Sequence, residues 1–196
     1  MGDSYKSYIA LDDLITGPLC IPYNEDLSTS IAATPPTTPI PLNYFNCDFE
    51  CNCPCSWNFD PTGTTNWQIK QGASDVLFTG PSADHTLQSS AGHYAYIITK
   101  SPVVFNDVAR LISQNISIPS NGMCFQFFYH MYGTSINRLN IYAKQNNNLG
   151  KAVWQKIGEQ GNKWNLGHVY LEKLGNVQLV IEGVAGNGIR YLILYF

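Results

Sequence analysis

The sequence predicts an all-β protein whose strands form a jelly-roll β-sandwich of two antiparallel sheets. Apolar residues recur with a period of two or in short continuous runs, and not with the 3.6-residue period of an amphipathic helix. Clusters of Gly, Asn, Pro and Ser separate these runs at short intervals. Only 13% of the 196 residues are charged, about half the ~25% of an average soluble protein, whereas 44% are hydrophobic.

Nine segments have the pattern of a strand. They are Tyr44–Glu50, Trp67–Gln71, His93–Thr99, Met123–Tyr132, Arg138–Lys144, Ala152–Ile157, His168–Leu171, Val177–Glu182 and Ile189–Phe196. A tenth segment, Val108–Ser113, could form a strand or a short helix. Because Met123–Tyr132 is apolar or aromatic on both faces, we expect a central strand with one face on the core and the other under a covering loop or a partner.

Composition divides the chain into three parts. Residues 1–20 contain a short strand-like run. Residues 21–41 form a linker, because their Thr/Pro-rich sequence cannot bury a core and is typical of extended spacers outside cells. Residues 42–196 carry nearly all of the aromatic and β-branched content, and we expect them to form one domain.

Charge and cysteine content narrow the class of protein. A net charge of −3 with only 11 Lys and Arg disfavours a nucleic-acid-binding protein. No signal peptide is visible at the start, and no apolar run approaches the length of a membrane span. Six cysteines, the spacer and the glycosylation sequon at Asn115 favour an extracellular or cell-surface fragment whose signal peptide and anchor lie outside the sequence. The alternative is a cytosolic protein with six free thiols.

The cysteines themselves allow more than one interpretation. Cys51, Cys53 and Cys55 alternate along the chain, so an extended backbone would place them on one side, where they could hold a soft metal ion. A zinc site would need a second ligand pair further along, which the sequence does not supply. The favoured interpretation is a short disulfide loop with two additional cysteines whose partners stay open.

No catalytic motif stands out. The four histidines lack metalloprotease spacing, and His130 lies in the most apolar strand, so we expect it to be a hydrogen-bonded structural residue. Acidic residues such as Glu50 and Asp84 lie near predicted strand ends, but a hard cation needs several oxygen ligands at once. We therefore expect a protein that is not an enzyme.

Several motifs follow one another along the chain. They are Cys47-Asp48-Phe49-Glu50, Cys55-Ser56-Trp57, Trp67, Gly92-His93-Tyr94-Ala95-Tyr96, the run Cys124–Gly133 and the run Gln178–Gly183. In this order they resemble the MAM domain, the module of meprin, neuropilin and receptor phosphatase mu, over residues 45–190. The resemblance implies a jelly roll that serves as a non-catalytic extracellular adhesion or recognition module of a larger membrane or secreted protein.

Both ends of the chain depart from the family pattern. The family finishes with a Gly-x-Ile-Ala-Leu-Asp-Asp strand and a last cysteine, whereas the chain after Arg190 reads Tyr-Leu-Ile-Leu-Tyr-Phe. The segment Tyr8–Asp13, with Cys20 after it, resembles that ending. The simplest account is that residues 1–20 are the C-terminal remnant of a preceding MAM domain, in a fragment of a tandem-MAM protein.

The resemblance also implies specific pairs and sites. It pairs Cys47 with Cys55, and it pairs Cys124 with a terminal cysteine that residues 42–196 lack. We hypothesise that the N-terminal strand fills the vacant place and brings Cys20 to Cys124. A calcium ion is implied near the sandwich edge, held by Glu50 and Asp84 with one Asp of the terminal pair. That pair is absent after Arg190, so the site would be incomplete.

The expected partners are proteins, with homophilic contact as one form, and the expected membrane association is only through parts of a parent protein. Tyrosines such as Tyr94 and Tyr142 could supply contact area at low entropic cost if they are exposed. The alternative function is a glycan-binding jelly roll in which Trp or Tyr rings stack on sugars and calcium orients them.

Overall fold

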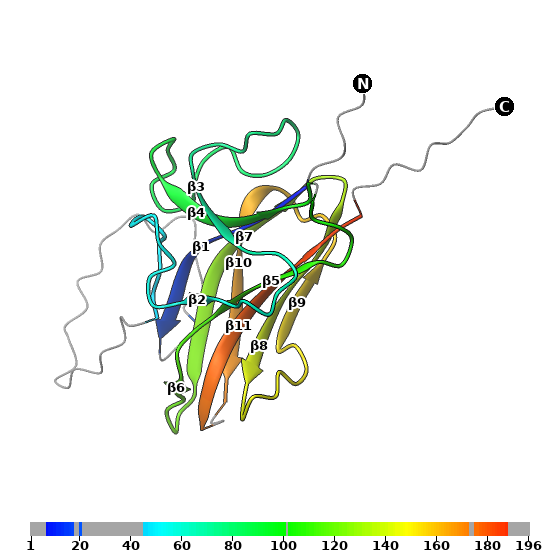
Figure 1. Cartoon of the computed structure of the whole chain (residues 1–196). Coiled ribbons are helices and arrows are strands. Elements are labelled where there is room, and N and C mark those ends of the chain that lie inside the picture. Colours follow the sequence, from blue (N-terminus) through cyan, green and yellow to red (C-terminus); the bar gives the residue numbers. More distant parts are fainter. Residues whose placement is uncertain (1–6, 18–19, 21–44, 101, 173–174, 188–196) are drawn as a thin grey trace.

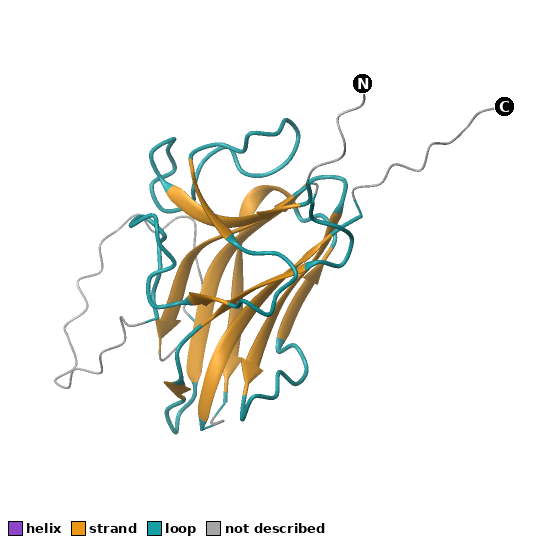
Figure 2. Ribbon diagram, in the orientation of Figure 1, coloured by secondary structure: helices purple, strands orange, loops and turns teal. Residues whose placement is uncertain are grey.

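The computed structural model describes residues 7–17, 20, 45–100, 102–172 and 175–187, which form eleven β-strands and no helix (Figure 2). The strands are β1 (Tyr8–Gly17), β2 (Asn58–Phe59), β3 (Gln68–Gln71), β4 (His93–Ile98), β5 (Val108–Ile112), β6 (Ile116–Ser117), β7 (Met123–Tyr132), β8 (Ile136–Lys144), β9 (Trp154–Ile157), β10 (Gly161–Leu171) and β11 (Asn176–Ala185). Within these residues, no segment could cross a bilayer as an apolar helix. The predicted all-β class is confirmed.

Two antiparallel sheets face each other (Figure 1). One sheet has the order β10-β7-β1-β4-β3, and the other has the order β2-β5-β11-β8-β9, with β6 paired to β11. Each sheet contributes one apolar face to the core. The core-facing side chains of β7 and β11 are Met123, Phe125, Phe127, Tyr129, Met131, Val177, Leu179 and Ile181. Burial of each such side chain contributes about 1.5–3 kcal/mol to the free energy of folding.

The N-terminal strand β1 is central in its sheet. It lies between β4 and β7, so that Ala10 is opposite both Tyr96 and His130. A bulge between Asp12 and Ile15 shifts the register and places Leu14 in the core. The segment therefore occupies the place that our insertion hypothesis assigns to it. Its origin in a preceding domain, and the domain boundaries 1–20, 21–41 and 42–196, stay predictions.

The outer face of the five-stranded sheet is also aromatic, and the loop 72–92 covers it. His85 of this loop stacks on Phe128 of β7, with ring centroids 3.4 Å apart. The indole Nε1 of Trp164 in β10 donates a hydrogen bond to the carbonyl oxygen of Ala83 at 3.0 Å. The prediction of a central strand under a covering loop is thus confirmed for β7.

Some predicted element bounds are wrong. Residues 45–50 do not form a strand, because only Cys47 makes a bridge, to Leu14, and Phe49 has a left-handed backbone with φ of 59°. The ambiguous segment Val108–Ser113 is a strand. The strand predicted at His168–Leu171 begins seven residues earlier, at Gly161. The strand predicted at Ile189–Phe196 lies outside the described residues.

Candidate functional site

Glu50 and Asp84, the predicted cation ligands, both lie against the residues at the start of β4. The carboxylate of Glu50 accepts a hydrogen bond from the His93 backbone N–H at 2.8 Å, and its second oxygen lies 3.4 Å from His93 Nδ1. Asp84 is buried and accepts backbone N–H groups from Leu87 and from Ser89. A Cβ at Gly92 would overlap the Asp84 carboxylate, so the two predicted ligands approach the same short segment.

Asp12 lies on β1, in the segment that resembles the family's Asp-Asp ending. It is the most buried acid of this region, with 0% exposure. Its carboxylate accepts hydrogen bonds from the backbone N–H groups of His85 at 2.8 Å and Thr86 at 3.3 Å. Burial raises the pKa of Asp12 to about 8. The neighbouring Asp13 carboxylate lies 2.5 Å from His85 Nδ1. Together the two aspartates attach the covering loop to β1.

These carboxylates do not fit a calcium site as they lie. Calcium takes six to eight oxygen ligands at about 2.3–2.6 Å. In the described part of the chain, the only group of three metal-ligand atoms within 4.8 Å of one another is formed by cysteines. The carboxylate oxygens of Asp12, Glu50 and Asp84 instead accept backbone N–H groups. Calcium binding is therefore implied by the resemblance alone, and the arrangement of these residues does not support it.

A pocket of about 350 Å³ lies beside the covering loop, with Trp164, His130, Asn162 and Gln88 among its lining residues. His130 is 2% exposed, and its Nε2 lies 3.2 Å from the Asn162 side-chain oxygen. Burial lowers the pKa of His130 to about 4, so the ring is neutral at pH 7. Its Nδ1 has no hydrogen-bond partner among the described residues. The expected structural histidine is therefore also part of a pocket wall.

All six cysteines are paired. Disulfides join Cys20 to Cys124, Cys47 to Cys55 and Cys51 to Cys53, across sequence separations of 104, 8 and 2 residues. The first two are the pairs that the insertion hypothesis and the resemblance assign. The third joins the two cysteines whose partners the sequence left open. No free thiol is left, so the alternatives of a soft-metal site and of six free thiols do not hold for this oxidised chain.

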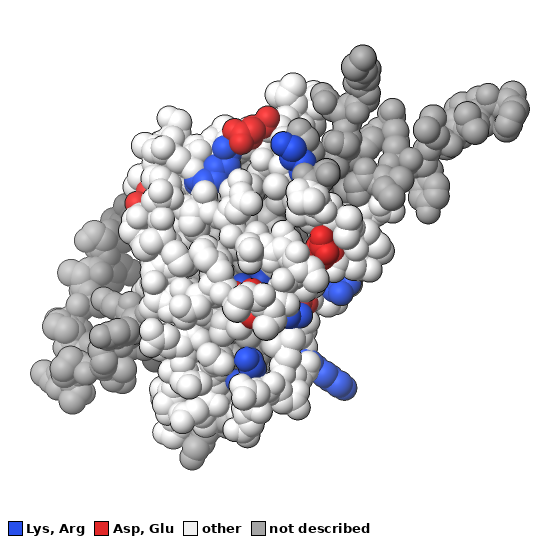
Figure 3. All heavy atoms as spheres, in the orientation of Figure 1, with Lys and Arg blue, Asp and Glu red and all other residues white. Residues whose placement is uncertain are grey.

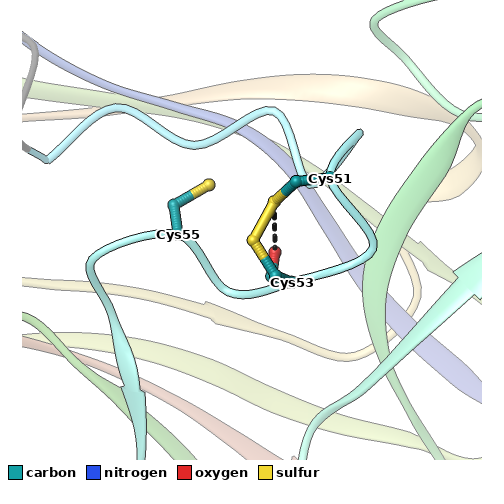
Figure 4. Close-up of side chains that lie close together, drawn as sticks. All are labelled: Cys51, Cys53 and Cys55. Carbon is teal, nitrogen blue, oxygen red and sulfur yellow. Dashed lines mark hydrogen bonds between the residues drawn. A yellow bond between two sulfur atoms is a disulfide. The ribbon is translucent and has the colours of Figure 1, made fainter.

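The short cysteine loop is anchored on its inner side. Phe49 and Trp57 are buried in the core, and Trp57 Nε1 donates to the Phe45 carbonyl oxygen at 2.9 Å. Cys47 and Leu14 exchange two backbone hydrogen bonds of 2.8 and 2.9 Å, which attach the loop to β1. The sulfur atoms of Cys51, Cys53 and Cys55 gather on the outer side (Figure 4).

Exposed apolar residues define a different candidate surface, which we call the apolar loop surface. Its members are Leu77, Phe78, Val104 and Phe105, with exposed fractions of 83%, 84%, 63% and 54%. The two loops that carry them meet, because Val76 and Val103 line one pocket of about 330 Å³. Charged groups are sparse and scattered over the face drawn in Figure 3.

The tyrosines named as candidate contact residues are placed differently. Tyr94 is fully buried and cannot touch a partner, which makes that part of the interpretation wrong. Tyr142 is half-buried, and its hydroxyl donates to Glu182 at 3.0 Å. Tyr170, which the sequence did not single out, is 52% exposed. Asn115 lies immediately before β6 and is exposed, so its side chain is accessible for glycosylation.

Comparison with known proteins gives one family. Residues 47–194 match the family model described as "MAM domain, meprin/A5/mu". The chain is 36% identical over 160 residues to MAM domain-containing glycosylphosphatidylinositol anchor protein 2 of Mus musculus. This alignment covers 74% of the chain and 17% of that protein. It is 32% identical over 168 residues to thyroid hormone-induced protein B of Xenopus laevis, covering 85% of the chain and 24% of that protein.

Neuropilin-1a of Danio rerio is 34% identical over 148 residues, covering 72% of the chain and 16% of that protein. The chain thus spans between 16% and 24% of the length of these three relatives. Among solved structures, the K1 cleaved adhesin domain of Lys-gingipain from Porphyromonas gingivalis W83 aligns with a TM-score of 0.40 and 13% identity, over 68% of this chain and 90% of that one. A likeness at this level carries no functional argument.

Proposed function

Because the chain belongs to the MAM (meprin/A5/mu) domain family, we propose that it is a non-catalytic adhesion or recognition module of a larger extracellular or cell-surface protein. Three disulfides and the exposed sequon at Asn115 support an oxidising, secretory environment. The name of one relative includes a glycosylphosphatidylinositol anchor, which supports a cell-surface location. The tandem arrangement suggested by residues 1–20 is part of the same proposal.

The apolar loop surface carries the proposal of protein binding. Large apolar side chains that are exposed together are typical of protein contact sites, whereas isolated ones are normal on any surface. Phe78 has a φ of 62°, so the backbone holds an aromatic ring outward in a conformation that such residues rarely adopt. The partner we propose is a protein with a complementary apolar patch, and a second copy of this chain is the first candidate.

A double variant, Leu77→Ser with Phe78→Asn, tests this proposal. Asn tolerates the left-handed backbone at position 78, so the change removes apolar area without adding strain. Beads coated with the full chain are expected to aggregate, and the variant is expected to weaken self-association at least about tenfold, because two exposed apolar side chains lose their burial.

Ile157→Ser is the matched control, because Ile157 is 65% exposed but lies on β9 in the other sheet. It should leave aggregation unchanged. Beads that never aggregate would contradict the homophilic form of the proposal. Equal loss in both variants would contradict the assignment to the apolar loop surface.

The pocket beside Trp164 supports glycan binding as a second candidate function. An aromatic wall with a few converging polar groups is the usual make-up of small-ligand sites. Trp164, Asn162 and Gln88 line this pocket, and His130 Nδ1 is a buried acceptor without a partner among the described residues.

A glycan array probed with the full chain tests this second function. Any hit is then titrated by tryptophan fluorescence, with Trp164→Phe compared to Trp154→Phe on β9. We expect only the first variant to lose the glycan-dependent signal. An array without hits, or equal loss in both variants, would contradict glycan binding at this pocket.

A further inference from the structure

The cysteine loop holds two disulfides whose sulfur atoms lie unusually close together. The Sγ atoms of Cys51, Cys53 and Cys55 all lie within 4.8 Å of one another (Figure 4). The carbonyl oxygen of Cys53 lies 3.5 Å from Cys51 Sγ and 3.9 Å from Cys47 Sγ, so the fourth sulfur belongs to the same cluster. We propose that Cys51–Cys53 is a thiol–disulfide exchange site, which external dithiols open first and whose freed thiolate can then displace Cys47 from Cys55.

Accessibility distinguishes this pair from the Cys20–Cys124 disulfide. Cys51 is exposed and Cys53 is half-buried, whereas Cys124 has no exposed surface. A dithiol must reach a sulfur atom along its approach path, so the outer pair is attacked more readily.

Ring size acts in the same direction. Cys51 and Cys53 enclose a single residue, whereas Cys20 and Cys124 are 104 residues apart. A cross-link over a short separation removes little chain entropy, and little folding free energy is lost when it opens. The outer pair therefore combines easier access than Cys20–Cys124 with the smallest structural cost of reduction.

The first step transfers two electrons from a dithiol to the protein. A thiolate of the reductant attacks one sulfur of the Cys51–Cys53 bond and forms a mixed disulfide, and the other cysteine leaves as a thiolate. The second thiol of the reductant closes its own disulfide and releases the bound cysteine. Both cysteines then take up protons, and the reductant is oxidised to a cyclic disulfide.

The second step is an exchange without net oxidation or reduction. A thiolate of Cys51 or Cys53 attacks Cys55 Sγ, which lies within 4.8 Å. A new bond to Cys55 forms, the Cys47–Cys55 bond breaks, and Cys47 leaves as a thiolate that takes up a proton. Because Cys47 pairs with Leu14 through the backbone, this exchange releases the covalent clamp beside the β1 bulge.

Stepwise reduction of the full chain tests the first step. The folded protein is equilibrated with increasing dithiothreitol, alkylated with N-ethylmaleimide, and mapped by peptide mass spectrometry. We expect half-labelling of Cys51 and Cys53 at a reductant concentration at least about tenfold below that for Cys20 and Cys124. Near-ultraviolet circular dichroism should show that the fold persists at that concentration. Simultaneous labelling of all six cysteines, or later labelling of Cys51 and Cys53, would overturn the proposal.

Two variants test the second step. In Cys51→Ser, we expect a mixture of species, one with free Cys53 and the other with a Cys53–Cys55 bond and free Cys47. The matched control is Cys51→Ser with Cys53→Ser, in which only the Cys47–Cys55 bond can form within the loop. A single-substitution variant whose only labelled residue is Cys53 would overturn the exchange step.

Discussion

Two buried ionisable residues of the outer sheet face respond in opposite ways to burial. Burial raises the pKa of Asp12 to about 8 and lowers that of His130 to about 4. In both cases the low-dielectric surroundings disfavour the charged form. The Asp12 carboxyl group also accepts backbone N–H groups of the covering loop, and these hydrogen bonds attach the loop to β1. These residues are therefore structural elements of the face that carries the candidate pocket.

The pKa of His130 predicts a loss of stability in mild acid. The folded-state pKa of about 4 lies below the reference value of 6.5, so only the unfolded chain binds a proton between these values. Stability is therefore lost as the pH falls from 6.5 towards 4. Between pH 7 and 4.5 the contribution amounts to about 2 kcal/mol.

Urea unfolding at these two pH values checks this prediction. His130→Gln removes the titration, so its free energy of unfolding should fall by about 2 kcal/mol less than that of the parent chain. His168→Gln is the control, because His168 is exposed on β10. An equal pH dependence in the parent and in His130→Gln would contradict the assignment.

Calcium is expected to leave the thermal unfolding temperature unchanged. Asp84 and Glu50 already accept backbone N–H groups, so calcium would have to displace these bonds. Differential scanning calorimetry with calcium and with a chelator checks this expectation. A rise in Tm of several degrees, lost in Asp84→Asn, would instead establish the calcium site that the family resemblance implies.

At the scale of elements, the disulfides differ in what they stabilise. Cys20–Cys124 ties the end of β1 to β7, across a separation of 104 residues. Cys47–Cys55 closes the loop that contacts the β1 bulge. Both therefore act on β1, the central strand of its sheet, whereas Cys51–Cys53 closes only an outer turn.

Removal of these cross-links should have graded effects. We expect the double variant Cys20→Ala, Cys124→Ala to lower the free energy of unfolding by about 4–5 kcal/mol, because the unfolded chain regains the entropy of a very long loop. The double variant Cys51→Ala, Cys53→Ala should lose only about 1–2 kcal/mol. Urea unfolding under non-reducing conditions measures both. Equal losses would show that the long cross-link does not restrict the unfolded chain as this structure implies.

At the scale of the whole molecule, the sandwich is completed by a strand that is remote in sequence. Residues 8–17 supply the middle of a five-stranded sheet whose other strands begin only at Gln68. Ile9 and Leu11 of this strand are core residues with at most 3% exposure. Without β1, the sheet would divide between β4 and β7.

Cleavage between β1 and the rest of the chain tests this dependence. With a protease site engineered into residues 28–41, the cut chain should stay joined by Cys20–Cys124 on a non-reducing gel. After reduction strong enough to open Cys20–Cys124, the N-terminal fragment should still co-elute in gel filtration, because β1 pairs with two strands. Release of the fragment without denaturant would contradict the central position of β1. The same protease treatment of the chain without the engineered site is the control.

Prediction from the sequence succeeds where local pattern decides and fails where distant residues meet. The two-sided character of Met123–Tyr132 is local, and its central position under a loop is confirmed. Residues 45–50 alternate like a strand, yet they coil because Phe49 and Trp57 must both reach the core from a loop closed by a disulfide. Tyr94 is of a residue type that is common at protein contact sites, but it is buried beneath the covering loop.

The alternation of side chains and the order of the motifs are properties of the sequence, and they determined the all-β class and the MAM family of this protein. Only the tertiary structure decided that β1 lies between β4 and β7, that Cys51 pairs with Cys53 and that Asp12 holds the loop 72–92. The physical reason is separation along the chain. Asp12 and His85 are 73 residues apart, and only the packed sandwich brings them within hydrogen-bond distance.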